Sequence, residues 1–147
     1  MKTTLLLLLG IATIACKKSK EITPVVPEPT IAQKVTKTWI ATEVTENGTI
    51  VYSKNGANNT KAAYSKFKLD LSSSNAAILT EFDGNAFTGT WEVTGQTLTL
   101  KGLKPKPSQT EGTVEYAISE VSTTKLKLSR NTVSAKTGGN AVAYILE

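Results

Sequence analysis

Few residues in this chain of 147 amino acids have side chains suited to catalysis or metal binding. Histidine is absent, and Cys16 is the single cysteine. These two facts exclude disulfides within the chain, zinc sites built from cysteine and histidine, Ser-His-Asp triads and Cys-His dyads. We therefore predict a protein with no metal centre and no cofactor.

The carboxylates do not form a catalytic pattern either. Five glutamates fall in predicted strands at positions typical of solvated faces: Glu43, Glu81, Glu92, Glu115 and Glu120. The segment Asp83-Gly84-Asn85 lacks further oxygen ligands at the spacing of a calcium loop, so it is better interpreted as a turn. No phosphate-binding glycine loop precedes a helix. We predict that the protein is not an enzyme.

Basic residues give the chain a formal net charge of +5, but Arg130 is its only arginine. Proteins that read nucleic acids use arginine forks and stacking aromatic rings, whereas these lysines alternate along strands like a solvated face. We predict no nucleic-acid partner. Arg130 shares its strand parity with Leu126 and Leu128, which points it inward. There its guanidinium would stack on an indole or meet an acidic ligand group; the alternative is that the strand has ended and the side chain faces water.

The N-terminus has the layout of a secretory signal. A short basic start precedes an apolar run from Leu5 to Ala15, which is too short to span a membrane. The segment Thr13-Ile14-Ala15-Cys16 resembles the bacterial lipobox, which implies that Cys16 is acylated (palmitate and related chains) and becomes the first mature residue. An ordinary signal peptide that ends beside a cysteine is the alternative. We expect residues 1–15 to be a lipoprotein signal peptide.

Residues 16–29 are predicted to form a tether between the lipidated cysteine and the folded domain. The segment is polar and then rich in proline, with Pro24, Pro27 and Pro29. Such spacing favours an extended, semi-rigid chain of roughly 40 Å, at about 3.1 Å per residue. We expect attachment to the bacterial cell envelope, at the outer membrane. The sequence does not decide between the periplasmic face and the surface face.

From residue 30 onward the pattern is that of an all-β domain covering residues 30–147. Thr30 and Gln33 fit a capping box, which predicts a short helix over about residues 31–37, and no helix is expected after it. About nine strands are predicted, over 39–45, 49–53, 64–71, 76–82, 87–94, 97–100, 113–121, 125–130 and 141–146. Their tight turns favour an antiparallel barrel or sandwich. Because charged residues occupy the outward positions, the barrel is not expected to span a membrane.

The hairpin of Phe87 to Leu100 is the strongest single signal. Phe87, Gly89, Trp91 and Val93 share one face of its first strand. A glycine inside a strand indicates a bend or a close approach of two backbones. We therefore predict that Gly89 lets the strand curve while Trp91 fills the middle of a small barrel.

Several of these segments together resemble the lipocalin-like domains of small bacterial lipoproteins of the Bacteroidetes type. The resemblance runs from about Val35 to Arg130 and is carried by Trp39, Phe67-Lys68-Leu69, Asp83-Gly84, Gly89-Thr90-Trp91, Leu98-Thr99-Leu100 and Lys125-Leu126-Lys127-Leu128. It implies a small antiparallel lipocalin-like barrel of 8–9 strands with a short N-terminal helix. The residues expected to line a ligand site in the barrel mouth are Phe67, Leu69, Trp91, Val93, Tyr116, Leu128 and Arg130.

Two functions remain open from the sequence. The first is non-covalent binding of a small apolar or amphipathic ligand inside the barrel. The second is a non-enzymatic interaction or assembly module with a filled core, whose partner is an envelope protein or polysaccharide. An apolar cavity of at least ~300 Å³ would favour the first. A core filled by Trp39, Phe67 and Trp91 would favour the second.

Overall fold

The structure, a computed structural model, describes residues 27–147. The predicted signal peptide, Cys16 and the tether as far as residue 26 lie outside the described residues. Within the described part of the chain, no helix is both long enough and apolar enough to cross a membrane.

Nine antiparallel strands form one sheet within residues 27–147. The elements in chain order are α1 (Ile31–Val35), β1 (Thr38–Glu46), β2 (Thr49–Ser53), η1 (Ala62–Lys66), β3 (Lys68–Asp70), β4 (Ala76–Thr80), β5 (Ala86–Thr94), β6 (Thr97–Lys104), β7 (Val114–Val121), β8 (Leu126–Arg130), η2 (Ala135–Thr137) and β9 (Val142–Leu146). The strand order is β2-β1-β3-β4-β5-β6-β7-β8-β9, and β1 also pairs with β9. This last pairing closes eight strands into a barrel, with β2 as an extra strand on β1, so the predicted all-β lipocalin-like barrel is confirmed.

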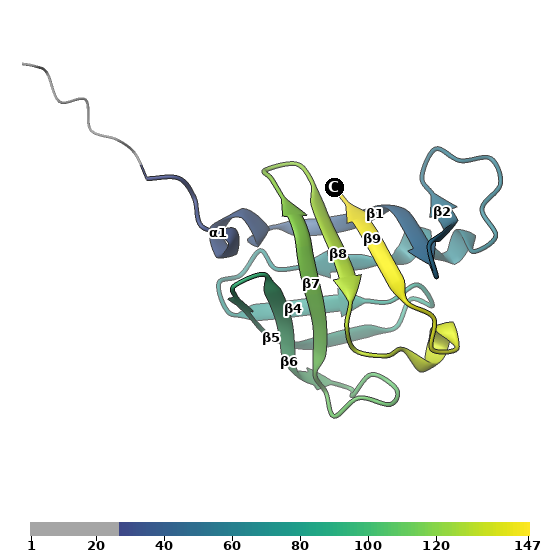
Figure 1. Ribbon diagram of the computed structural model, residues 1–147. Helices are drawn as coiled ribbons and strands as arrows, with labels where there is room; N and C mark the ends of the chain where they lie inside the picture. The colour runs from purple at the N-terminus through teal and green to yellow at the C-terminus, as the bar shows by residue number, and fades with distance from the viewer. Residues whose placement is uncertain (1–26) are drawn as a thin grey trace, which may run out of the picture.

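The two halves of the barrel cross each other steeply. In Figure 1, β7 and β8 run in front of β4 and nearly at right angles to it. Such crossing follows from the twist and tilt that strands need to close a small barrel. Side chains from the inward faces then meet in one central core.

The short helix α1 is confirmed, and it ends at Val35 rather than near residue 37. The Thr30 side chain accepts a hydrogen bond from the Gln33 backbone N–H (3.2 Å), and the Gln33 side chain accepts one from the Thr30 N–H (2.8 Å). Trp39 Nε1 donates to the Val35 carbonyl oxygen at 2.8 Å. This bond ties the helix to the start of β1, so α1 covers one end of the barrel.

The predicted strand over 64–71 is wrong in its first half. Residues Ala62–Lys66 form the 3₁₀ helix η1, and only Lys68–Asp70 pair as a strand. The reason is competition for one edge of β1. That edge pairs with β3 over Thr38–Ile40 and with β2 from Glu43 onward, so the earlier residues of this segment have no free edge to join. A second 3₁₀ helix, η2, also corrects the expectation of no helical turn after residue 37.

Gly89 lies where the backbones of β5 and β6 approach each other closely. The pairing register shifts between Thr88 and Thr90, which marks a β-bulge. A Cβ atom added at Gly89 would overlap the carbonyl oxygen of Lys101 and lie 3.1 Å from Leu103. The predicted close backbone approach at Gly89 is therefore confirmed.

Candidate functional site

One end of the barrel holds a group of charged side chains, of which two are buried and two are partly exposed. We call this the β4–β5 end, because β4 leads into β5 there, and we call Glu81, Asp83, Arg130 and Lys136 the charge cluster. Arg130 Nη1 lies 2.9 Å from Glu81 Oε1, and both side chains are at most 5% exposed. Lys136 Nζ lies 2.6 Å from both Glu81 Oε2 and Asp83 Oδ2. Two cations and two carboxylates thus balance one another, and solvent is largely excluded from the pair of Arg130 and Glu81.

Three tyrosine rings surround this cluster inside the barrel. Tyr116 and Tyr144 lie edge to face with ring centroids 6.1 Å apart, and Tyr64 and Tyr144 are 6.3 Å apart in the same manner. Burial raises the pKa of Tyr116 to about 12, although the Arg130 guanidinium acts against that rise. Burial likewise raises the pKa of Tyr144 well above its usual range. All three phenols are therefore protonated near neutral pH.

A second buried carboxylate, Glu46, closes the same end from the side of β1. Its oxygens accept hydrogen bonds from Lys61 Nζ (2.6 and 2.8 Å), the Tyr64 hydroxyl (2.7 Å) and Asn140 Nδ2 (2.9 Å). Burial pushes the pKa of Glu46 upward, but the bonds from Lys61, Asn140 and Tyr64 outweigh it and leave the pKa lowered. Glu46 is therefore ionised at neutral pH.

The predicted ligand-site residues all line the interior but do not form one wall. Phe67, Leu69, Tyr116 and Leu128 are almost fully buried, and Val93 is half-buried against the core. Trp91 points to the opposite end, where its Nε1 donates to Ser73 in the turn between β3 and β4 (2.9 Å). Tyr116 and Arg130 are directly opposite each other on β7 and β8, and Leu128 lies on the same strand as Arg130, two residues away.

Two predictions made from the sequence are wrong: the stacking of Arg130 on an indole and the solvated position of Glu81. Arg130 points inward as expected, but its guanidinium pairs with Glu81, and no indole lies over it among residues 27–147. Glu81 was expected on a solvated face and is buried instead. Its parity was a usable signal, since it follows Ala77 and Leu79 at two-residue steps onto the inward face. Lys136 and Tyr144 were also missed. Tyr144 shares its strand parity with Val142 and Leu146, which could have marked it as inward, whereas nothing local in the sequence marks Lys136.

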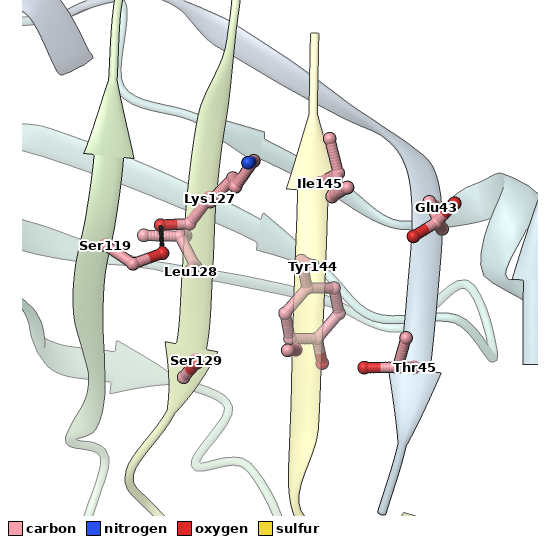
Figure 2. A pocket seen from close by; sticks show the side chains of 9 residues that line it. Glu43, Thr45, Ser119, Lys127, Leu128, Ser129, Tyr144 and Ile145 are labelled. Atoms are coloured by element: carbon pink, nitrogen blue, oxygen red, sulfur yellow. Dashed lines mark hydrogen bonds between the residues drawn. The ribbon is translucent and has the colours of Figure 1, made fainter. Parts of the chain in front are cut away.

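A shallow groove crosses the outside of the barrel over β1, β9 and β8. Figure 2 shows the side chains that line its upper part, with Glu43 and Thr45 on β1 and Lys127 and Ser129 on β8, on either side of β9. Thr45, Ala143 and Ser129 are cross-strand neighbours, so small side chains form a continuous floor. Two adjoining hollows, of about 180 and 220 Å³, share these three residues. The groove results from their small size beside the larger Ile145 and Lys127.

Comparison with known proteins agrees with this architecture. The sequence model of the lipocalin-like domain family matches residues 35–128. The chain belongs to the lipocalin-like domain family. No curated protein matches this lipocalin-like chain.

Two solved structures resemble this lipocalin-like domain at low sequence identity. A lipocalin-like protein from Bacteroides uniformis is 13% identical with a TM-score of 0.45, and the match covers 78% of this chain and 97% of that one. An uncharacterized protein from Bacteroides eggerthii is 12% identical with a TM-score of 0.46, covering 76% of this chain and 96% of that one.

The interior of this lipocalin-like barrel is occupied by its own side chains. Trp39 and Phe67 are at most 1% exposed and Trp91 is 9% exposed. Phe67 stacks on Tyr144 with centroids 4.3 Å apart. The lipocalin-like fold is compatible with small-ligand binding. With these rings in place, however, the two hollows of the outer groove open on the outside of the barrel.

Proposed function

We propose that this chain is a non-enzymatic interaction module of the bacterial cell envelope, anchored to the membrane through Cys16. The observation that carries the proposal is the filled interior, since Trp39, Phe67 and Trp91 occupy the space that a lipid-sized ligand would need. A rigid barrel of this kind binds through its surface. The tether of residues 16–29 would hold that surface away from the lipid headgroups.

The outer groove is the surface that best fits a partner. Its floor of Thr45, Ala143 and Ser129 allows close approach of another backbone. Above that floor, Glu43 and Lys127 stand on either side of Ile145, so one carboxylate and one ammonium flank an apolar side chain. This arrangement fits an extended segment of an envelope protein, which presents alternating apolar and charged side chains.

Filling the groove should abolish partner binding. We expect Ser129→Tyr to lose a partner that native pull-down from solubilised envelope recovers with the parent protein, because the ring would cover the groove floor. Thr88→Tyr is the matched control, since Thr88 is also an exposed strand residue but lies on β5, away from the groove. Equal recovery with both variants would exclude the groove as the contact. Recovery of no stoichiometric partner by the parent would contradict the interaction module.

Anchoring has a separate test. Cys16→Ala should release the protein from washed membranes into the soluble fraction, because no thiol remains to carry the acyl chains that hold it there. Fractionation followed by immunoblotting measures the distribution, and Cys16→Ser serves as a second variant. Retention of both variants on washed membranes would contradict lipidation at Cys16.

Binding of a small amphipathic ligand is the second candidate, and the polar β4–β5 end favours it. Buried charges are costly, and they concentrate at functional sites more often than in purely structural cores. Native mass spectrometry of the protein purified from its own host would reveal a co-purified ligand. A spectrum with the apoprotein mass alone would count against this candidate.

A further inference from the structure

Within residues 27–147, the Tyr116 hydroxyl is the one buried side-chain group that has neither a hydrogen bond nor an ion pair. Three buried side-chain atoms in the described residues lack a well-aligned hydrogen bond: Glu81 Oε2, Lys136 Nζ and the Tyr116 hydroxyl. The first two lie 2.6 Å apart and form an ion pair. Tyr116 is fully buried, and its hydroxyl has neither an ionic nor a hydrogen-bonding contact. Leaving such a group unpaired is costly, so the site points to an occupant.

The surroundings of this hydroxyl favour a negatively charged acceptor. Arg130 lies directly across from Tyr116 on the neighbouring strand, with its side chain also inside the barrel. A guanidinium carries five N–H donors, and the bonds to Thr132 (3.0 Å) and Glu81 (2.9 Å) use two of them. The guanidinium also interacts with the Tyr144 hydroxyl, which leaves at most two donors for a ligand. Arg130 also acts on the pKa of Tyr116 more strongly than Glu81 does. Of these two charges the guanidinium has the larger effect on the hydroxyl, which favours an acceptor that can bind Arg130 as well.

We propose that the β4–β5 end of the barrel binds a small carboxylate, which accepts a hydrogen bond from the Tyr116 hydroxyl and contacts the remaining donors of Arg130. A planar carboxylate matches the guanidinium fork and has a second oxygen for the phenol. This site lies inside the barrel and is independent of the outer groove and of any protein partner bound there.

The packing around the site limits the ligand to a short chain. Phe67, Tyr144 and Tyr64 fill the space beneath the charge cluster, with ring centroids 4.3 to 6.3 Å apart. Residues 131–141 cover this end of the barrel. The ion pairs of Lys136 with Glu81 and Asp83, the hydrogen bonds of Asn140 with Glu46 and Asn47, and the buried Ser134 and Thr137 hold the segment there. Entry of a ligand therefore requires this segment to move as a unit, while the pairing of the strands beneath it stays in place.

Titration calorimetry of the purified full-length protein with sodium butyrate tests the proposal. Butan-1-ol and butylamine are the neutral and cationic counterparts of the same length. We expect saturable binding of butyrate, which Tyr116→Phe weakens by roughly tenfold or more because a charge-assisted hydrogen bond is lost. Tyr52→Phe is the matched control, since Tyr52 is also buried but lies on β2, outside the closed barrel.

Thermal unfolding of the same proteins separates binding from a structural role. Without ligand, Tyr116→Phe should unfold no earlier than the parent, since it removes an unpaired hydroxyl. Butyrate should raise the Tm of the parent and of Tyr52→Phe, but raise that of Tyr116→Phe less. Equal binding of butan-1-ol or butylamine, undiminished butyrate binding by Tyr116→Phe, or no saturable butyrate binding by the folded parent would each overturn the proposal. A clear loss of Tm in Tyr116→Phe without ligand would also overturn it, because the hydroxyl would then have a structural partner.

Discussion

Gly89→Ala is expected to destabilise the folded barrel by about 3 kcal/mol, although it adds a single methyl group. The added Cβ would overlap the carbonyl oxygen of Lys101 and press against Leu103 at 3.1 Å. Backbone atoms of a paired strand cannot move aside as the end of a flexible side chain can. The β5–β6 pairing must therefore open locally or distort. Urea unfolding followed by tryptophan fluorescence measures the loss as a lower midpoint.

Gly95→Ala separates this steric effect from the loss of glycine's conformational freedom. Gly95 has a φ of +59° in the β5–β6 turn, and a Cβ there meets no atom within 4 Å. Its replacement should cost about 1 kcal/mol, from the left-handed backbone alone. If both variants lost the same stability, close packing at Gly89 would not be the reason for that glycine.

Much of this fold follows from local patterns in the sequence. Alternation along the β5–β6 hairpin placed Phe87, Trp91 and Val93 on the inward face, and the capping box at Thr30 placed the start of α1. These signals succeed because each depends on residues a few positions apart. The closure of β1 on β9 needs contacts about 100 residues apart, and only the general barrel pattern indicated it.

Bulges are where alternation fails. The pairing of β1 shifts between Ala41 and Glu43, so the inward face passes from Trp39 and Ala41 to Val44 and Glu46. If strict alternation had continued past Ala41, the side chain of Glu43 would point inward and that of Glu46 outward. The sequence carries no glycine or proline in that stretch to mark the irregularity, and the buried role of Glu46 was hidden for this reason.

The candidate site was predictable only in part. Parity pointed Arg130 inward, but its partner Glu81 lies 49 residues away on the opposite side of the barrel. The outer groove is even less visible, because it depends on the cross-strand register that aligns Thr45, Ala143 and Ser129. Small residues scattered over three strands carry no local signal. Sites of this kind need the strand register as well as the pattern of each strand.

Removing Glu81 is expected to be the most damaging single change at the β4–β5 end, at about 4 kcal/mol for Glu81→Leu. Arg130 would remain 5% exposed with only the Thr132 carbonyl as its acceptor, and Lys136 would keep Asp83 alone. Arg130→Met should cost less, because Glu81 retains Lys136 at 2.6 Å. Urea unfolding of each variant measures the order. Glu92→Leu is the control, because the pair of Glu92 with Lys101 is about half exposed and should contribute about 0.5 kcal/mol.

The double variant Arg130→Met with Glu81→Leu decides whether the buried pair stabilises the barrel or serves another purpose. Replacing both partners by apolar side chains removes the uncompensated charge, so the double variant should be more stable than Glu81→Leu alone by about 2 kcal/mol. A double variant close to the parent in stability would mean that the pair contributes little net stability, and that its retention reflects a function at this end of the barrel. If the stability losses of the two single variants simply added up in the double variant, the two side chains would act independently. The 2.9 Å contact between Arg130 and Glu81 predicts that they do not.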